Sequence, residues 1–243
     1  MKIDVLTIFP EMYLPLSSGI IGKALEKGLA EVNIVNIRDY SSNKHKKTDD
    51  YPFGGGAGMV MTPQPLHDAI QAVDPSRMAL RIYLSPKGAR LDQEAVERLS
   101  KLDRIVLVNG AYEGIDERVI ELDIDEELSI GDYVLTSGDL ASMVVIDAVM
   151  RYIPGVLGSD RSTEEESFSS ELLEYPQYTR PMSFMGLDVP EVLVSGNHAE
   201  IAKWRLNESI KLTAERRPDL LEKYNIKSNS GSCREDSSAT CKK

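Results

Sequence analysis

Strand-like and helix-like patterns alternate through the first 150 residues, and this alternation constrains the fold more than any other feature of the sequence. Apolar runs that favour strands occupy residues 2–8, 31–37, 79–84 and 104–110. The last of these runs, RIVLVNG, is apolar almost throughout, which is typical of a strand buried on both faces. Segments with apolar residues at helical spacing lie between the runs. The pattern therefore predicts an α/β domain with a mainly parallel sheet.

Helices are expected at residues 17–28, 62–73, 91–101 and 140–151, with a short one after Gly114, whereas residues 129–139 favour strand and turn. Ligands of parallel sheets bind beyond the carboxyl ends of the strands. Those ends carry three polar turns, which makes them the candidate site: Ser85-Pro86, Asn109-Gly110 and Gly131-Asp132.

The charge balance bears on the partners of the chain. Its 243 residues include 28 Lys and Arg against 39 Asp and Glu, a net charge of -11. This balance disfavours an indiscriminate nucleic-acid binder, because phosphate binding rewards clustered cations. A selective RNA binder is still compatible, since cations cluster at residues 44–47 and again near the C-terminus, at Lys203, Arg205, Lys211, Arg216 and Arg217.

The sequence also indicates the compartment. No apolar run reaches the roughly 18–20 residues of a membrane span. The two cysteines, Cys233 and Cys241, lie in a polar tail and fit a reducing environment. We therefore expect a cytoplasmic protein that does not associate with a membrane.

Several common catalytic motifs are missing. The glycine cluster at 54–58 has neither the Lys-Ser/Thr of a phosphate loop nor the G-x-G-x-x-G spacing, so a structural loop and a functional loop both stay open. The histidines are scattered and C-x-x-C is absent, so no metal site is expected. The glycine-bearing turns at 109–118 and 130–139 could cradle a nucleoside through backbone groups, or could be plain strand-end turns.

The character of the chain changes after Pro154. Residues 1–158 are expected to form the α/β domain, and the acidic, serine-rich stretch 159–175 a flexible linker. Residues 176–226 contain two helix patterns split near Arg217-Pro218 and predict a small helical domain. Residues 227–243 have the composition of a disordered tail.

Eight stretches, in order and with similar spacing, make the chain resemble the bacterial tRNA (guanine-N1)-methyltransferases that modify the guanine at tRNA position 37, just 3′ of the anticodon. The resemblance runs from residue 1 to about 225. Its stretches are IFPEM (8–12), YPFGGGAGMVM (51–61), YLSPKG (83–88), YEGIDER (112–118), SIGDYVLT (129–136), RYIPGVLG (151–158), ESFSSELLEYPQYTRP (166–181) and SGNHAEIAKWR (195–205).

The resemblance implies properties that composition and periodicity do not reveal. It implies a deep trefoil knot in the N-terminal domain, S-adenosylmethionine as methyl donor, and a helical C-terminal domain that grips the anticodon region of tRNA. It also implies an obligate homodimer whose active sites are built from both subunits, and it suggests stimulation by Mg²⁺.

The resemblance also assigns roles to individual residues. Arg151 and Glu166 match the catalytic arginine and the catalytic aspartate, which removes the proton from guanine N1. Phe168 is expected to stack on the extruded base, and Ser167 and the five C-terminal cations are also expected to bind tRNA. The cofactor-binding residues are expected to be Tyr83, Leu84, Ser85, Pro86, Gly110, Tyr112, Glu113, Gly114, Ile130, Gly131, Asp132, Tyr133, Val134, Leu135 and Gly138.

Four positions depart from the family pattern. Glu166 stands where aspartate is expected, Asn109 where cysteine is usual, Ala111 where arginine or histidine is usual, and Ser137 in place of a glycine. Two other functions stay open on the sequence alone. One is a knotted methyltransferase that acts on another RNA, and the other is a protein that binds S-adenosylmethionine without catalysis.

Overall fold

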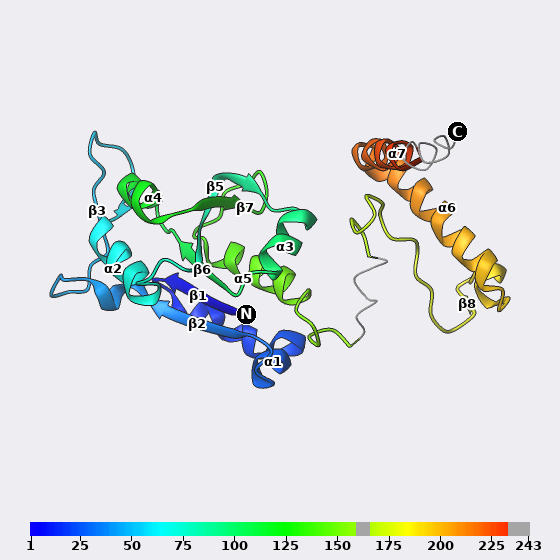
Figure 1. The fold of residues 1–243 in the computed structure, drawn as a ribbon, viewed down its shortest axis with the longest axis horizontal. Coiled ribbons are helices and arrows are strands. Elements are labelled where there is room, and N and C mark those ends of the chain that lie inside the picture. The colour runs from blue at the N-terminus through cyan, green and yellow to red at the C-terminus, as the bar shows by residue number, and fades with distance from the viewer. Residues whose placement is uncertain (159–165, 233–243) are drawn as a thin grey trace, which may run out of the picture. The chain divides into compact units, whose positions relative to one another are not determined.

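The computed structural model describes residues 1–158 and 166–232, and the chain divides into two compact units, Met1–Asp160 and Arg161–Lys243. The first unit is an α/β sandwich and the second is mainly helical (Figure 1). Among the described residues, no helix combines the length and the apolar character that crossing a bilayer requires.

The first unit is built on a five-stranded sheet in which every pairing is parallel. The strand order is β2-β1-β6-β5-β7, which confirms the predicted α/β class. The strands are β1 (Lys2–Thr7), β2 (Glu31–Asn36), β5 (Leu80–Arg90), β6 (Arg104–Asn109) and β7 (Glu126–Ser129). The two-residue strands β3 (Asp49–Asp50) and β4 (Val60–Met61) pair separately.

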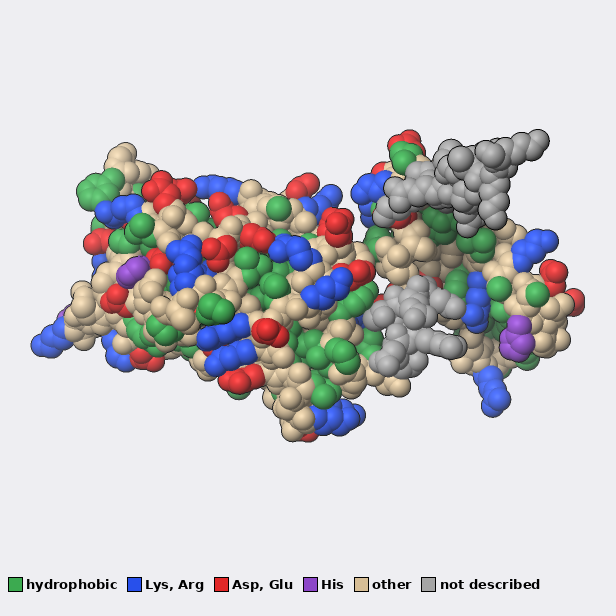
Figure 2. Space-filling view, in the orientation of Figure 1, with side chains coloured by type: hydrophobic (Ala, Val, Ile, Leu, Met, Phe, Trp, Pro, Cys, Tyr) green, Lys and Arg blue, Asp and Glu red, His purple; other side chains and the backbone are tan. Residues whose placement is uncertain are grey.

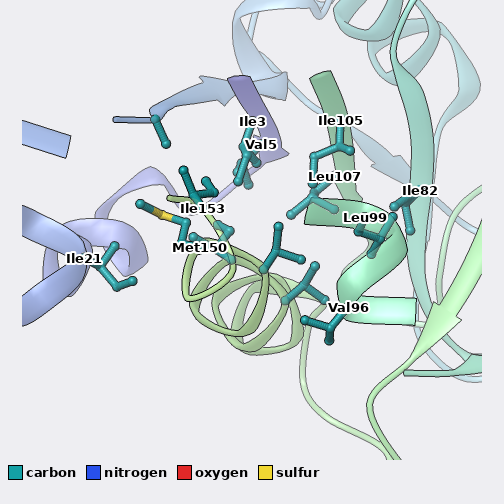
Figure 3. Close-up of a cluster of buried hydrophobic side chains, with 14 of the residues drawn as sticks. Ile3, Val5, Ile21, Ile82, Val96, Leu99, Ile105, Leu107, Met150 and Ile153 are labelled. Atoms are coloured by element: carbon teal, nitrogen blue, oxygen red, sulfur yellow. The ribbon is translucent and has the colours of Figure 1, made fainter. Parts of the chain in front are cut away.

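Helices cover both faces of this sheet. The buried core of one face joins the sheet to α1 (Gly19–Glu26), α3 (Gln93–Ser100), α5 (Asp139–Met150) and the 3-10 helix η1 (Pro10–Ser17). The core of the other face includes α2 (Pro63–Val73), α4 (Glu117–Asp123) and the 3-10 helix η2 (Ile37–Tyr40). Figure 3 shows the first core, where Ile105 and Leu107 of β6 lie near Val96 and Leu99 of α3. Since β6 is buried on both faces, its sequence is apolar without alternation.

The sheet departs from the sequence prediction at β7. The strand occupies Glu126–Ser129, and residues 130–138, expected to contain strand, form an irregular loop with a single isolated bridge from Ser137 to Ala111. β7 begins with acidic residues, so the sequence does not show an apolar strand pattern there. The strand tolerates Glu126 because its carboxylate forms a bidentate ion pair with Arg98 at 2.7 and 2.9 Å. The predicted turn at 85–90 is a bulge within β5, whose pairing with β7 breaks after Leu84 and resumes at Ala89.

The second unit begins, among described residues, at Glu166. Its helices are α6 (His198–Arg216) and α7 (Pro218–Ser232), which confirms the two predicted patterns and their split. The 3-10 helix η4 (Glu191–Val194) and a hairpin of β8 (Ser183–Phe184) and β9 (Leu187–Asp188) precede them.

Two predicted boundaries need correction. From Glu166 onward the stretch expected to be a linker packs on α6, because Leu172 is buried and the N–H of Leu173 donates to Thr213 Oγ1 at 2.9 Å. The first part of that linker, residues 159–165, lies outside the described residues. The expected tail also begins too early, since α7 continues through residues 227–232. Residues 233–243 lie outside the described range.

Candidate active site

A cleft opens at the carboxyl edge of the sheet, where β6 and β7 end and the bulge interrupts β5. Three segments line it, within residues 83–87, 110–117 and 128–138, together with Ile120 and Ala141; Asp116 and Asp132 are the members of these segments that lie outside the lining. The cleft has a volume of about 210 Å³, or about 940 Å³ when the open space at its mouth is counted. The structure thus brings together the three strand-end turns that the sequence singled out.

The residues expected to bind the cofactor converge on this cleft. All of them line it except Asp132, which belongs to the same loop but not to the lining. Several lining residues were not anticipated: Lys87, Ala111, Ile115, Glu117, Ile120, Leu128, Ser129, Thr136, Ser137 and Ala141. These residues lie in or beside the three loops. The sequence indicates them only through their proximity to the predicted turns.

Tyr83 forms the floor beneath the second loop. Its ring is buried, and a side chain at Gly110 would place Cβ only 2.8 Å from the Tyr83 hydroxyl. Burial, with a smaller contribution from the Glu127 carboxylate, raises the pKa of Tyr83 to about 12, although the backbone N–H of Ile115 opposes the shift. Tyr83 is therefore a neutral phenol at physiological pH, and the backbone of Gly110 lies directly on it.

Unusual backbone conformations shape the other two loops. Tyr112 has a φ of 60° and Gly114 a φ of 119°, so the second loop turns sharply over the cleft. In the third loop Gly131 has a φ of 153°, and a Cβ there would meet the Tyr133 ring at 2.5 Å. Tyr133 and Val134 are largely exposed at the rim.

The glycine cluster that stayed unassigned in the sequence borders this site. A Cβ at Gly58 would come within 2.5 Å of Glu113 Oε1, so the loop packs directly on a cleft residue. The N–H of Glu113 donates to the Met59 carbonyl at 3.0 Å, and that of Met61 donates to the Gly114 carbonyl at 2.9 Å. The cluster therefore supports the second loop, and it also displays the fully exposed ring of Phe53.

The two predicted catalytic residues lie in different units. Arg151 follows α5 as its C-cap residue and is half-buried, in a position where a cation also favours the helix dipole. Glu166 is half-buried at the start of the described part of the second unit, and its carbonyl accepts hydrogen bonds from the N–H and Oγ of Ser169 at 3.2 and 2.7 Å.

The residues expected to bind tRNA are spread over the second unit. Phe168 is 43% exposed, and the Arg217 guanidinium lies 6.0 Å from the centre of its ring. The Ser167 hydroxyl accepts a hydrogen bond from the N–H of Glu174 at 3.0 Å.

The five predicted cations do not form one stripe. Lys203 and Lys211 lie toward one side of α6, whereas the helical period places Arg205 and Arg216 near the opposite side. Arg205 lies over the Tyr175 ring at 4.6 Å, and Arg217 pairs with Asp219 at 2.7 Å. Figure 2 likewise shows basic and acidic side chains interspersed on the visible surface of the first unit.

The chemistry of the cleft fits an adenosyl ligand. Glycines at 110, 114, 131 and 138 line the cleft with backbone instead of side chains, so a flat ligand can approach the loops closely. Leu84, Pro86, Ile130, Val134 and Leu135 supply apolar surface for a flat ring. The described residues contain no cluster of three or more His, Cys, Asp or Glu side chains that could hold a metal ion.

Comparisons with known proteins agree with this geometry. Residues 1–223 match the family described as tRNA (Guanine-1)-methyltransferase TrmD. A protein of Caldanaerobacter subterraneus named tRNA (guanine-N(1)-)-methyltransferase is 59% identical over 227 residues, which cover 93% of this chain and 94% of that protein. Proteins of the same name from Alkaliphilus oremlandii and Geobacter sulfurreducens are 56% and 52% identical, with coverage of 92% and 96% of this chain and 93% and 96% of theirs.

Proposed function

The chain belongs to the tRNA (guanine-1)-methyltransferase TrmD family, and from this premise we propose that it transfers a methyl group from S-adenosylmethionine to N1 of the guanine at tRNA position 37. The observation that carries the proposal is the cleft at the ends of β6 and β7 and the bulge of β5. Its glycine-rich loops and apolar walls suit the adenosyl group. The similarity to named tRNA methyltransferases extends across both units.

The reaction requires a base and a partner for the charge that develops. Guanine N1 carries a proton near neutral pH, and its removal leaves negative charge largely on O6. In this proposal Glu166 accepts the N1 proton as general base, and Arg151 stabilises the charge on O6. When bound, S-adenosylmethionine supplies an electrophilic methyl group on a positively charged sulfur. The three cleft loops orient that group, and Phe168 stacks on the extruded guanine.

The proposal includes a homodimer whose active sites are shared. Leu140 and Val144 of α5 are each 46% exposed, and Val134 beside the cleft is 82% exposed. Such apolar side chains next to a binding site favour burial against a second protein surface. A second copy of the chain would cover them and bring its own Glu166 or Arg151 to the cleft.

The remaining features of the proposal concern location, ions and topology. The helical unit, with exposed Lys203, Lys211 and Arg216, binds the anticodon region of tRNA. The enzyme works in the cytoplasm, Mg²⁺ stimulates it, and its N-terminal unit carries the trefoil knot of the family. The parallel sheet and its three strand-end loops are compatible with that knot.

A methyl-transfer assay tests the proposal. Labelled S-adenosylmethionine is incubated with tRNA transcripts that differ only at position 37, and the product nucleosides are analysed. We expect 1-methylguanosine from the transcript with guanine 37 and no incorporation with adenine 37. Incorporation into ribosomal RNA alone would favour another RNA substrate, and tight S-adenosylmethionine binding without transfer would favour a non-catalytic binder.

A further inference from the structure

A buried polar network lies beneath the cleft, at the carboxyl ends of β1 and β6. Its centre is Asp139, the first residue of α5, whose side chain is 1% exposed. Thr7 Oγ1 and the Tyr13 hydroxyl donate to Asp139 Oδ1 at 2.6 and 2.9 Å, and Ser137 Oγ donates to Oδ2 at 2.7 Å. These three donors are hydroxyl groups and carry no positive charge.

The network continues to the second cleft loop through Asn109. Asn109 Nδ2 donates to the Tyr13 hydroxyl at 2.7 Å, and Oδ1 accepts a hydrogen bond from Ser142. Asn109 is the last residue of β6 and directly precedes Gly110, which lines the cleft. Two departures from the family pattern, Asn109 and Ser137, are therefore both members of this network.

The network also holds the second and third loops against each other. Ser137 and Gly138 line the cleft and directly precede Asp139. The N–H of Gly138 donates to the Gly110 carbonyl at 2.8 Å, and a Cβ at Gly138 would meet Asn109 Cα at 3.1 Å. The distance between the loops is thus set by a close backbone contact, and Asp139 anchors the segment that makes it.

Elementary energetics explain why a carboxylate stands at this position. The N-terminus of α5 favours negative charge, and hydrogen bonds to a carboxylate are stronger than those between neutral groups. Burial, followed by the neighbouring Asp139, raises the pKa of Tyr13 above its ordinary value, so the phenol keeps its proton and donates. Removal of the charge would leave buried hydroxyls poorly satisfied and free to rotate away.

We propose that Asp139 is a positioning residue for S-adenosylmethionine, which holds the loops at 110–114 and 130–138 at the spacing that cofactor binding requires. It acts through Ser137 on the third loop, and through Tyr13 and Asn109 on the second. It does not touch the cofactor or the guanine. The inference rests on the proposed function only in that the cleft binds S-adenosylmethionine.

The test compares Asp139→Asn with Asp147→Asn in the full-length protein. Asp147 is a matched control, because it lies on α5 but is exposed. Calorimetric titration with S-adenosylmethionine, without tRNA, is combined with thermal unfolding and steady-state kinetics. For Asp139→Asn we expect the dissociation constant and the KM for S-adenosylmethionine to rise at least about tenfold. The kcat at saturating cofactor and the KM for tRNA should stay within about threefold, and the control should match the wild type.

A structural role would give a different result. Loss of folded protein lowers kcat but leaves the KM for S-adenosylmethionine unchanged, and that outcome would overturn the proposal. Should Asp139→Asn fail to fold, Ser137→Ala removes the donor nearest the cleft, and Ser137→Thr restores a hydroxyl. We expect weaker cofactor binding in the first and recovery in the second, and equal affinities would refute the proposal.

The same measurements separate this inference from the proposed function. A wild type that binds S-adenosylmethionine but methylates no tRNA would refute the proposed reaction and leave the positioning role standing. A wild type that methylates guanine 37 while Asp139→Asn binds the cofactor normally would refute the positioning role alone. A wild type that does not bind S-adenosylmethionine would refute both.

Discussion

A side chain at Gly110 should collapse cofactor binding, because no space exists for it. The added Cβ would lie 2.8 Å from the Tyr83 hydroxyl and 3.0 Å from Cε2, and real Cβ atoms seldom approach so closely. Tyr83 is 7% exposed and packed in the core of its face, so its ring has little freedom to retreat. The loop must move instead, and overpacking of this kind costs about 1–3 kcal/mol.

If cofactor binding requires the original position of the loop, this cost reduces the free energy of binding. Each 1.4 kcal/mol corresponds to a factor of about ten, so Gly110→Ala should raise the dissociation constant for S-adenosylmethionine roughly 5- to 150-fold. Calorimetry measures this change directly. Gly158→Ala is the control, since no atom of the described residues beyond its chain neighbours lies within 4 Å of a Cβ placed there.

A double-mutant cycle tests the stated cause. Tyr83→Phe removes the hydroxyl oxygen that the new Cβ would meet, so Gly110→Ala combined with Tyr83→Phe should bind more tightly than additivity predicts, by about 1 kcal/mol. Strictly additive losses would refute the reasoning, because they would show that Gly110 and Tyr83 act independently.

Three further predictions concern charge, pH and assembly. Lys203→Glu with Lys211→Glu should raise the KM for tRNA about tenfold and flatten its salt dependence. Arg217→Glu should raise this KM less, because Arg217 is paired with Asp219, and an equal rise in both variants would argue against the assignment. Burial raises the pKa of Tyr83 to about 12, so the protonated phenol contributes fully to the free energy of unfolding below about pH 10 and this contribution is lost as the pH rises toward 12. Denaturant titrations should show that the free energy of unfolding falls by about 2–3 kcal/mol over this range in the wild type, and that Tyr83→Phe lacks this fall. An Arg151→Ala subunit mixed with a Gly110→Ala subunit should recover activity in heterodimers if the sites are shared, and a fully active monomer in sedimentation would exclude sharing.

The sequence could predict the elements whose signal is local. The run at 104–109 is apolar because β6 is buried on both faces, and Pro218 separates α6 from α7 because proline cannot continue a helix interior. The edge strand β7 was not predicted because its signal is not local. Its Glu126 is paired with Arg98, which is 28 residues away in the sequence.

The candidate site was predictable in its loops but not in its supports. The glycine-bearing turns after β6 and β7, with Ser85-Pro86 beside them in β5, signal a site because parallel strands end at one edge. The network around Asp139 joins residues 132 and 126 positions apart, and no local pattern reports such pairs. A weak signal existed nevertheless: Asp139 is an acid at the start of a mainly apolar helix, where an exposed cap and a buried anchor look alike.

The most direct test of the chemistry is substitution of Glu166. The sequence around this residue predicts a flexible linker, whereas the structure gives the turn after it specific contacts. A buried Leu172 and the hydrogen bond from Leu173 to Thr213 fix the turn that follows it. Glutamate reaches about one carbon–carbon bond further than the aspartate of the family pattern, and a misplaced base can cost about 100-fold.

We nevertheless expect Glu166 to be the working base, because residues 164–166 are all glutamates and only Glu166 directly precedes Ser167-Phe168. Glu166→Gln keeps the size of the side chain but cannot accept a proton. It should lower single-turnover methyl transfer by about 100-fold or more and leave S-adenosylmethionine binding unchanged. Glu166→Asp should keep substantial activity, and Glu171→Gln in the same turn should behave like the wild type. Near-normal methyl transfer in Glu166→Gln, together with slow transfer in Glu165→Gln, would refute the assignment and identify Glu165 as the base. Both neighbours are glutamates, so only the match to the family pattern selects Glu166.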